Sequence, residues 1–599
     1  MEKTPLLTSR RDKGKSRRFE GVSLLVVATL SLGISLWVLL RAHAFLRYES
    51  PGFWDLNGKE GVEEGGGEWR WKDIKPAKQL RWKRCYENYD CAVLDVPLDW
   101  VEPSDKLRAS IAVIRLNATI RGDEYKGAVF INPGGPGGSG IWFIKHFSPY
   151  YQTVVGKNYD IISFDPRGVG FTAPHISCLT PSSSLLWSLL TPPVLDAHAG
   201  ILHDAYARAQ AFSQACSPFQ NSTSALAYVS TASTARDMYA LVQATGNEKL
   251  NYWGFSYGTY LGVTFASLFP EKVGRMVNDG NVDAIEYTNS RGVGFIHDTE
   301  KVMDAFFHFC FLAGSTGCQF WDTSEDAIRT RLDLLLQELK RNPVIVPATN
   351  EGGRPEIIAF SSLRRLITST LYRPLIMFPS LATVLSGLER GDGSLFLALR
   401  PPISQDPFGC SNDVDEELEG TEDAEKAIMC SDNGGVEEGV DVFGKYVDKL
   451  IGLSPSAGAT MAEMRLGCVG WKGRARWRFD GPFEGNTTTP ILFIANKADN
   501  VTPLRSAIAN QKGFPGSKIL IQDSYGHTSL STPSHCTVKA IRAYFQHGTL
   551  PADMSICNAD LVPFEPWDIN DPTSSSFEDR ELNLALRELM KMPIPGLFR

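Results

Sequence analysis

Short apolar runs and helix-spaced patterns alternate along the first half of the chain. The short runs, bounded by turn residues, predict strands at residues 91–100, 111–116, 128–132, 159–164, 250–253 and 273–277. Helical spacing of apolar residues predicts helices at 233–245 and 259–269. Strands that alternate with helices are typical of a mainly parallel sheet, so an α/β fold is expected here.

The alternation stops in residues 284–485. Helical patterns such as Ala327–Leu339 are separated there by loops. The strongly acidic stretch Asp413–Asp441 is predicted to be a solvated loop, with an anion-repelling rim around a site as the alternative. An interruption of about 200 residues is too long for a loop in a compact domain. The segment is therefore expected to form a mostly helical cap or lid.

Strand patterns return at residues 490–495 and 518–522, and a helix is predicted to follow at 538–546. The sheet domain is therefore expected to consist of two halves that the cap separates. An amphipathic helix at 577–592 is expected to dock on its own chain. The predicted division of this part of the chain is core 81–283, cap 284–485, core 486–560 and tail 561–599.

Residues 22–40 are apolar and uncharged, long enough for a helix to cross the hydrocarbon core of a bilayer. Positive charge is concentrated before this run. The positive-inside rule therefore predicts a cytoplasmic tail (1–20), a transmembrane signal anchor (21–41) and a juxtamembrane linker (42–80). The rest of a single-pass type II membrane protein would be luminal or extracellular, in the secretory or vacuolar pathway. A signal peptide cleaved after Ala42–Ala44, which would release a secreted protein, is the alternative.

The composition fits a globular body and argues against one class of partner. Of the 599 residues, 43% are hydrophobic and 21% are charged, which excludes a largely disordered chain. The net charge is −8, and residues 1–20 carry seven Lys and Arg against three Asp and Glu, so the body of the chain carries −12. An acidic body argues against nucleic acid as the partner.

Two further features agree with export from the cytoplasm. Asn-x-Ser/Thr triplets are candidate glycosylation sites at Asn117, Asn221, Asn486 and Asn500. In an oxidising lumen, close cysteine pairs are expected to form disulfides: Cys85 with Cys91, Cys310 with Cys318, and Cys536 with Cys557. Reduced core cysteines are the alternative. The total of 11 cysteines is odd, and Cys410 is expected to stay unpaired.

The run Gly254-Phe255-Ser256-Tyr257-Gly258 matches the nucleophile elbow G-x-S-x-G. This motif exposes a serine hydroxyl on a sharp turn between a strand and a helix. A predicted strand enters the run and a predicted helix leaves it, as the motif requires. Ser256 is therefore the predicted nucleophile, and a tight turn without a nucleophile is the alternative.

A nucleophile in this setting is followed along the chain by an acid and then by a histidine. His527 lies just after the strand predicted at 518–522 and is the expected general base. Asp499 follows the strand before it and is the expected acid, because these two strands are consecutive. Asp279 also satisfies the chain order and is the rival for the acid.

Two backbone N–H groups are needed to stabilise the oxyanion of an acyl-transfer reaction. Tyr257, directly after the nucleophile, is expected to supply one, and the glycine-rich run 132–140, which includes Gly135, the other. The same run also fits the dinucleotide fingerprint G-x-G-x-x-G, with Asp160 twenty residues after Gly140. A dinucleotide enzyme is therefore the alternative class, although it leaves the predicted triad unexplained. The cysteines and histidines lack zinc-ligand spacing, so neither a metal nor a cofactor is expected.

With these residues in place, the sequence resembles α/β-hydrolase serine peptidases of the prolyl aminopeptidase and tripeptidyl aminopeptidase kind, with a TAP-like carboxyl-terminal region. The matching runs are CAVLDVPLDW, NPGGPGGSG, YDIISFDPRGVGFT, YWGFSYGTYLGVTFASLFPEKV, ADNVTP and YGHTS. The resemblance implies that Ser256, Asp499 and His527 form the triad, with Gly135 and Tyr257 at the oxyanion hole. It also implies a structural role for Asp165–Gly168, which would brace the turns around the site.

The sequence departs from the family in two places that concern the substrate. Asn132-Pro133 stand where the proline-specific relatives have histidine before Gly-Gly-Pro-Gly, and the insertion is only weakly matched. The expected function is a membrane-anchored serine hydrolase, an exopeptidase that releases short units from peptide amino termini. An esterase of the same fold and a non-catalytic binding protein are the alternatives. The expected partners are a peptide or small ester substrate and, through the one amino-terminal helix, a membrane.

Overall fold

A computed structural model describes residues 70–180, 183–184, 187, 190–216, 225–289, 292–348, 355–399, 421–565 and 577–592. The predicted transmembrane anchor, Asn221 and Cys410 lie outside these ranges. Among the described residues, no helix is both long and apolar enough to cross a membrane.

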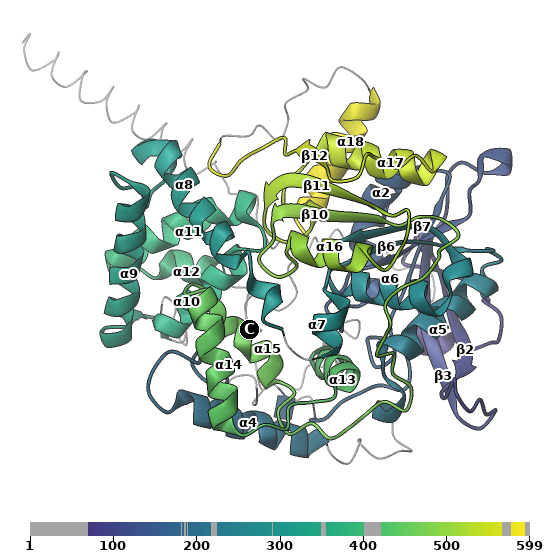
Figure 1. The fold of residues 1–599 in the computed structure, drawn as a ribbon, viewed down its shortest axis with the longest axis horizontal. Helices are drawn as coiled ribbons and strands as arrows, with labels where there is room; N and C mark the ends of the chain where they lie inside the picture. Colours follow the sequence, from purple (N-terminus) through teal and green to yellow (C-terminus); the bar gives the residue numbers. More distant parts are fainter. Residues whose placement is uncertain are drawn as a thin grey trace, which may run out of the picture. The chain divides into compact units, whose positions relative to one another are not determined.

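The core of the molecule is one twisted sheet of ten described strands (Figure 1). Their spatial order is β1-β2-β3-β5-β4-β6-β7-β10-β11-β12. The strands are β1 (Lys83–Cys85), β2 (Tyr89–Pro97), β3 (Arg108–Leu116), β4 (Ala128–Asn132), β5 (Asp160–Phe164), β6 (Leu250–Phe255), β7 (Val273–Asp279), β10 (Leu492–Ala498), β11 (Lys518–Tyr525) and β12 (Ser555–Asn558). All the strands predicted from the apolar runs are present, most of them longer by a few residues.

The expectation of a mainly parallel sheet is confirmed. The strands from β5 to β12 in the spatial order pair in parallel, and only β1, β2 and β3 join antiparallel at one edge. Strand β4 lies between β5 and β6, so Phe130 is opposite both Ile162 and Tyr252. Such central strands are apolar on both faces because helices cover both sides.

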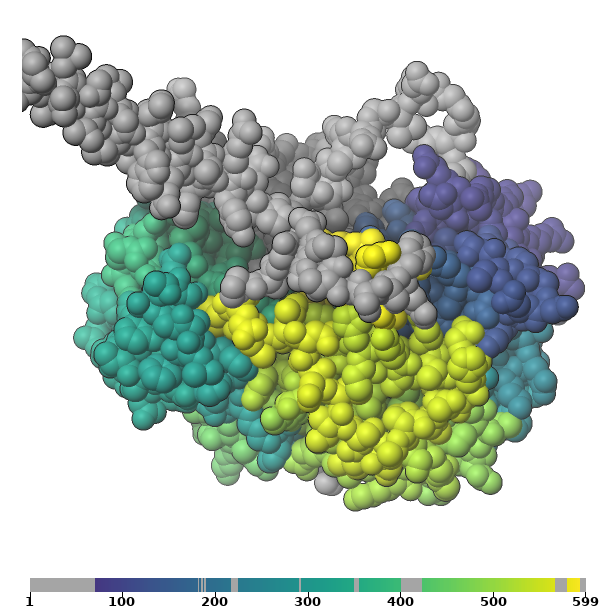
Figure 2. Space-filling model, turned by 90° about the horizontal axis from the view of Figure 1, so that it is seen from above, coloured from purple at the N-terminus to yellow at the C-terminus, as the bar shows by residue number. Residues whose placement is uncertain are grey.

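Helices pack on the two faces of the sheet and enclose two apolar cores. One face carries α2 (Gly140–Val155), α17 (His535–His547) and α18 (Phe577–Met590), and the other carries α5 (Thr231–Ala244), α6 (Tyr257–Leu268) and α16 (Leu504–Gln511). The predicted carboxyl-terminal helix is thus α18. Its buried Leu582, Leu586 and Leu589 pack in the core on the face that carries α2 and α17. Figure 2 looks onto the face that carries α2, α17 and α18. The carboxyl-terminal part of the chain (yellow) lies there beside an earlier part (blue), in agreement with the contacts of α17 and α18 with α2.

Residues between β7 and β10 are mostly helical, as the pattern of residues 284–485 predicts. Their elements are α7 (Ala284–Thr288), α8 (Thr299–Gly317), α9 (Glu325–Arg341), β8 (Val344–Val346), β9 (Glu356–Ile358), α10 (Phe360–Thr370), α11 (Pro374–Glu389), α12 (Ser394–Ala398), α13 (Thr421–Asn433), α14 (Val440–Leu453) and α15 (Gly458–Leu466). One further helix, α4 (Ile201–Cys216), precedes α5 in the chain and contacts α14 and α15. We call residues 284–485 the helical insertion.

The prediction of a solvated loop at Asp413–Asp441 is wrong for residues 421–433. Residues Thr421–Asn433 form helix α13, and its buried residues include Ala424, Ala427, Ile428 and Cys430. These positions repeat at helical spacing, so α13 has an apolar face although its composition is acidic. Two of its carboxylates, Asp423 and Asp432, are themselves buried.

The structure contains five disulfides among the described cysteines. The three predicted pairs are present: Cys85–Cys91, Cys310–Cys318 and Cys536–Cys557. Two more join residues 38 positions apart: Cys178–Cys216 and Cys430–Cys468. Close spacing in sequence could not identify these last two, because their partners meet only in the folded chain.

Candidate active site

Ser256 lies on the turn between β6 and α6, as the elbow motif predicts. Its backbone has φ 54° and ψ −122°, a left-handed conformation that a non-glycine residue rarely adopts. The two flanking glycines are required by packing. A Cβ on Gly254 would lie 2.6 Å from the carbonyl oxygen of Gly258, and one on Gly258 would lie 2.8 Å from Asn132 Oδ1. The turn therefore presents the Ser256 side chain, which is half-buried, at the carboxyl edge of the sheet.

His527 and Asp499 are hydrogen-bonded to each other beside this edge. His527 Nδ1 lies 3.0 Å from Asp499 Oδ2 and 3.1 Å from Oδ1. A carboxylate can only accept, so Nδ1 carries the proton and Nε2 is left as the basic nitrogen. Thr502 Oγ1 donates to Asp499 Oδ2 at 2.8 Å and lies 3.1 Å from His527 Nδ1.

The Asp499 carboxylate is held in its ionised form. Burial is the largest single influence and would raise its pKa. The charge and hydrogen bond of His527, together with the N–H groups of Thr528 and Val501, outweigh burial and lower the pKa below its ordinary value. An ionised acid fixes the tautomer of His527 that a general base needs.

Asp279, the rival for the acid, has a different partner. Its carboxylate accepts hydrogen bonds from the backbone N–H (2.8 Å) and the hydroxyl (2.5 Å) of Ser529. Burial raises the pKa of Asp279 to about 6, although the bonds from Ser529 lower it. Asp279 therefore anchors the loop that follows His527, and the ring of His527 bonds to Asp499.

A single turn connects the nucleophile to the histidine. The N–H of Ser256 donates to the carbonyl of Asp279 at 3.0 Å. A Cβ on the next residue, Gly280, would lie 3.4 Å from Cε1 of His527, the ring carbon bonded to Nε2. Asp279–Gly280 thus lies between Ser256 and His527, and the site contains all three predicted triad residues.

The glycine-rich loop after β4 packs directly on the nucleophile. A Cβ on Gly134 would lie 3.1 Å from Ser256 Cβ and 3.2 Å from the backbone nitrogen of Tyr257. The N–H of Tyr257 is in the first turn of α6, where no intrahelical acceptor exists. Gly135 follows in the same turn with φ 112°. The loop and the start of α6 therefore bring N–H donors of the required kind to Ser256.

Asp165, from the DPRG run, braces this loop. It accepts hydrogen bonds from Ser139 Oγ (2.7 Å) and from the N–H groups of Ile141 (3.1 Å) and Phe171 (2.9 Å). Ser139 is the residue that caps α2 directly after the glycines. The resemblance implies bracing by this motif, and these contacts show how it is done.

The surroundings of Asp160 argue against the dinucleotide alternative. Its side chain is 3% exposed and pairs with Arg121 at 2.9 Å. It also accepts hydrogen bonds from the N–H of Ala118 (2.7 Å) and the hydroxyl of Tyr125 (2.8 Å). The acid that a dinucleotide site would use for a ribose is therefore occupied by protein groups.

The helical insertion contributes residues to the site that sequence reasoning missed. The carbonyl of Tyr372 accepts from the N–H of His527 at 3.0 Å, and its ring packs edge-on to the imidazole at 5.4 Å. The buried Arg373 donates to the carbonyl of His527 at 3.0 Å. Burial lowers the pKa of Arg373 to about 10, although the nearby charges of Asp279 and Asp499 would raise it. The segment before α11 thus holds both backbone groups of the histidine.

The insertion makes a second contact near the site, through Asp432 and Thr231. Asp432 on α13 accepts from the N–H of Thr231 (2.9 Å) and from its hydroxyl (2.6 Å). The Thr231 hydroxyl is also hydrogen-bonded to the hydroxyl of Tyr257. Burial raises the pKa of Asp432 to about 7, although Thr231 and Arg478 lower it. This network fixes the side chain of Tyr257, the residue that directly follows Ser256.

Asparagine in place of Asp432 is expected to flatten the pH dependence of stability. The folded protein keeps the Asp432 proton up to about pH 7, whereas the unfolded chain releases it near 3.8. The contribution of Asp432 to the free energy of unfolding therefore falls by about 1.4 kcal/mol per pH unit between these values. Denaturant unfolding at pH 5 and pH 7 should show a smaller loss in Asp432→Asn than in wild type. Equal losses in the two proteins would contradict the raised pKa.

The candidate glycosylation sites differ in accessibility. Asn486 is exposed, and Asn117 is half-buried with its Nδ2 donating to Asp90 at 2.6 Å. Asn500 is 1% exposed, in the loop that carries the acid, which leaves no room for a glycan. Asn486 is therefore the best placed of the described sites. Within the described part of the chain, no group of His, Cys, Asp and Glu side chains could hold a metal ion.

Comparison with known proteins agrees with the geometry. Residues 127–306 match the alpha/beta hydrolase fold family, and residues 454–557 match the TAP-like protein family. A tripeptidyl aminopeptidase of Streptomyces lividans is 27% identical over 505 residues, which cover 81% of this chain and 87% of the relative. Serine protease Hip1 of Mycobacterium tuberculosis is 27% identical over 527 residues, 82% and 93% of the two chains. Carboxylesterase B of the same species is 28% identical over 503 residues, 80% and 90%.

The chain has an α/β-hydrolase fold with a TAP-like carboxyl-terminal region. Tripeptidyl aminopeptidase and the Hip1 serine protease are among its distant homologues.

Proposed function

We propose that the protein is a serine exopeptidase that releases short units from the amino termini of peptides through an acyl-enzyme. The hydrogen bond of His527 to Asp499, beside a strained Ser256 on the elbow, carries the proposal of catalysis. The similarity to tripeptidyl aminopeptidase supports a peptide as the substrate. The insertion, which contacts both His527 and Thr231, supports a cleft closed on one side.

In the proposed reaction Nε2 of His527 takes the proton of the Ser256 hydroxyl as the oxygen attacks the scissile carbonyl. Asp499 stabilises the imidazolium that forms. The N–H groups of Tyr257 and Gly135 stabilise the oxyanion. His527 then protonates the leaving amine, and water, activated by the same histidine, releases the acyl group as a carboxylate and restores Ser256.

A second candidate function is ester hydrolysis with the same triad. It is favoured by the similarity to Carboxylesterase B, which is no more distant than the peptidases. Both reactions pass through an acyl-enzyme, so the triad does not distinguish them.

Hydrolysis of matched substrates tests the proposal. We expect tripeptide amides with a free amino terminus to be cleaved with a kcat/KM at least about tenfold above that of their amino-acetylated forms, the equivalent of about 1.4 kcal/mol of transition-state binding. Short-chain esters of the same acids serve as the comparison. Equal cleavage of free and acetylated peptides would contradict an exopeptidase, and cleavage of esters alone would establish the second candidate.

We also propose a type II membrane topology, with the catalytic body in an oxidising compartment. The apolar run at residues 22–40 and the positive charge before it support the orientation. Five disulfides support the compartment, since such bonds are rare in reducing cytosol.

A further inference from the structure

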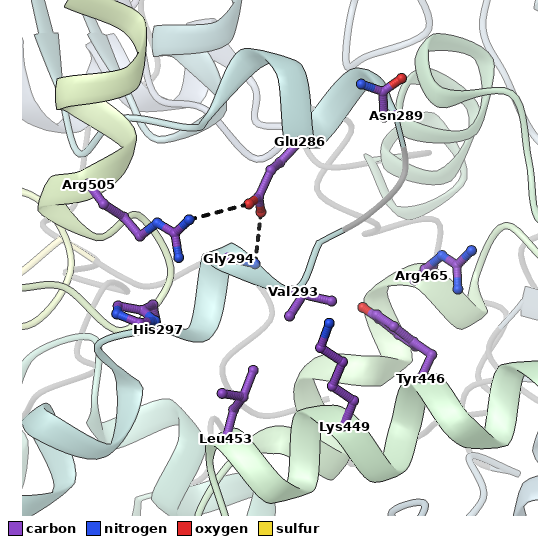
Figure 3. A pocket seen from close by; sticks show the side chains of 10 residues that line it. All are labelled: Glu286, Asn289, Val293, Gly294, His297, Tyr446, Lys449, Leu453, Arg465 and Arg505. Carbon is purple, nitrogen blue, oxygen red and sulfur yellow. Dashed lines mark hydrogen bonds and ion pairs between the residues drawn. The ribbon is translucent and has the colours of Figure 1, made fainter.

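A cavity of about 520 Å³ lies between the helical insertion and the sheet domain (Figure 3). Its walls come from α7, the 3₁₀ turn Gly294–Ile296, α14, α15 and the start of α16. The ionisable side chains used below are Glu286, Tyr446, Lys449, Arg465 and Arg505. None of them belongs to the triad.

The cationic side chains of this cavity outnumber its one acid, and that acid is already engaged. Glu286 accepts a hydrogen bond from the N–H of Gly294 at 2.7 Å and lies 3.9 Å from Arg505. Arg465 is paired with Glu438 at 2.6 Å. Lys449, in contrast, makes no ion pair or hydrogen bond with any described residue. The cavity therefore has spare positive charge, and its carboxylate is not free for an amine.

Two donors of the cavity point toward one place, and a third lies across from them. In Figure 3 the ammonium group of Lys449 and the hydroxyl of Tyr446 both point toward the middle of the cavity, beside Val293. Burial raises the pKa of Tyr446 to about 12, so its hydroxyl keeps its proton and can donate. Arg505 closes the opposite side, and its guanidinium has more donors than its loose contact with Glu286 uses.

Two residues that line the cavity are close in sequence to residues that contact the candidate active site. Arg505 follows Thr502, which contacts both Asp499 and His527, by three residues, so their Cα atoms are at most about 11 Å apart. Glu286 precedes Tyr287, whose ring packs 6.1 Å from that of Tyr257. An extended peptide spans about 3.3–3.6 Å per residue. Two or three residues of extended peptide span about 7–11 Å, the same range as the separation of Thr502 and Arg505.

We propose that this cavity binds a carboxylate of the peptide substrate, with Lys449, Arg505 and the Tyr446 hydroxyl as its donors. The inference rests on the proposed peptidase function and adds a preference to it. The carboxylate has two possible sources, an acidic side chain within the released unit or a carboxylate on the leaving side. Both place the same chemistry two or three residues from the bond.

Paired substrates in wild type and Lys449→Met test the inference. One pair of free-amine tripeptide amides differs only in Glu against Gln, at the second or third residue from the bond. A second pair places Glu against Gln, or a free against an amidated carboxyl terminus, on the leaving side. Wild type should favour the carboxylate in one pair by about fivefold in kcat/KM, and Lys449→Met should lose that preference through a lower kcat/KM for the carboxylate peptides.

Lys445→Met is the matched control, because Lys445 is exposed on the same helix α14 and does not line the cavity. It should keep the wild-type preference, which separates a site contact from the general charge of the helix. Peptide cleavage with the same Glu-to-Gln ratio in wild type and Lys449→Met would overturn the inference and leave the peptidase function standing. A wild-type preference for lysine at these positions would also overturn it, in favour of an amine on Glu286. Failure to cleave any peptide would overturn the proposed function itself.

Discussion

Asparagine in place of Asp499 is expected to lower kcat/KM by about 10³–10⁴-fold, whereas the same change at Asp279 should cost less than about tenfold. Asp499 bonds to His527 Nδ1 at 3.0 Å and keeps the ring in the tautomer with a basic Nε2. An amide that donates to Nδ1 would favour the other tautomer. Asp279 instead accepts from Ser529, so its loss affects the anchoring of a loop. Steady-state kinetics on one peptide amide measures both variants.

The comparison controls for folding, because the two acids are both buried and lie at the ends of neighbouring strands. Asp279→Asn should lower the free energy of unfolding by about 1–2 kcal/mol through the weakened bonds to Ser529. Asp499→Asn should lose at least as much stability, because Asp499 accepts more hydrogen bonds than Asp279, but it should stay folded while it is almost inactive. A larger loss of turnover at Asp279 than at Asp499 would contradict the assignment of the acid.

Methionine in place of Arg167 is expected to destabilise the fold by about 3–5 kcal/mol, because it leaves the buried Asp237 without its counter-charge. The side chains of Arg167 and Asp237 are each 1% exposed, and two hydrogen bonds of 2.7 and 2.9 Å join them. The guanidinium also donates to backbone carbonyls of Pro97, Leu98 and Tyr228. It therefore connects the end of β2 to α5 and the segment before it. Denaturant unfolding measures the loss.

The double variant Arg167→Met, Asp237→Leu provides the control. Removal of both charges leaves no unpaired ion, so the double variant should be more stable than Arg167→Met alone. Trp100, whose indole N–H donates to Asp237 at 2.7 Å, limits the recovery because it loses an acceptor. A single variant within 1 kcal/mol of wild type would show that the pair does not hold these elements together.

Local patterns were sufficient to predict the parts of the site that lie on strand ends. The G-x-S-x-G run identified Ser256 because its two glycines are needed for steric reasons. A Cβ at Gly254 or Gly258 would clash with neighbouring atoms. Chain order and consecutive strands favoured Asp499 over Asp279, and the bond to His527 agrees with that preference. In each case the informative residues are close in sequence to the element that positions them.

The contributions of the insertion could not be predicted from the same patterns. Asp432 lies 201 residues from the Thr231 it contacts, and Arg373 lies 154 residues from His527. Their side chains are charged, so composition alone places them on the surface, as it placed α13 in a solvated loop. Burial of these groups is set by tertiary partners that no local pattern contains.

Local patterns also could not predict the positive charge of the cavity that we propose for the substrate. Lys449 and Arg505 come from α14 and α16, on different sides of the insertion boundary, and line one cavity only in the folded chain. The overall charge of −8 gives no hint of a basic cavity beside the active site. In the proposed account, substrate preference depends on the packing of the insertion, while the chemistry depends on the sheet.

Labelling of the intact protein with a fluorophosphonate probe tests the proposed catalysis most directly. The probe forms a covalent bond only with an activated serine, so labelling reports the nucleophile without knowledge of the substrate. Wild type should be labelled at a single site, identified as Ser256 by peptide mass mapping, and Ser256→Ala should not be labelled. Labelling that persists in Ser256→Ala, or that is absent from folded wild type, would contradict a catalytic Ser256.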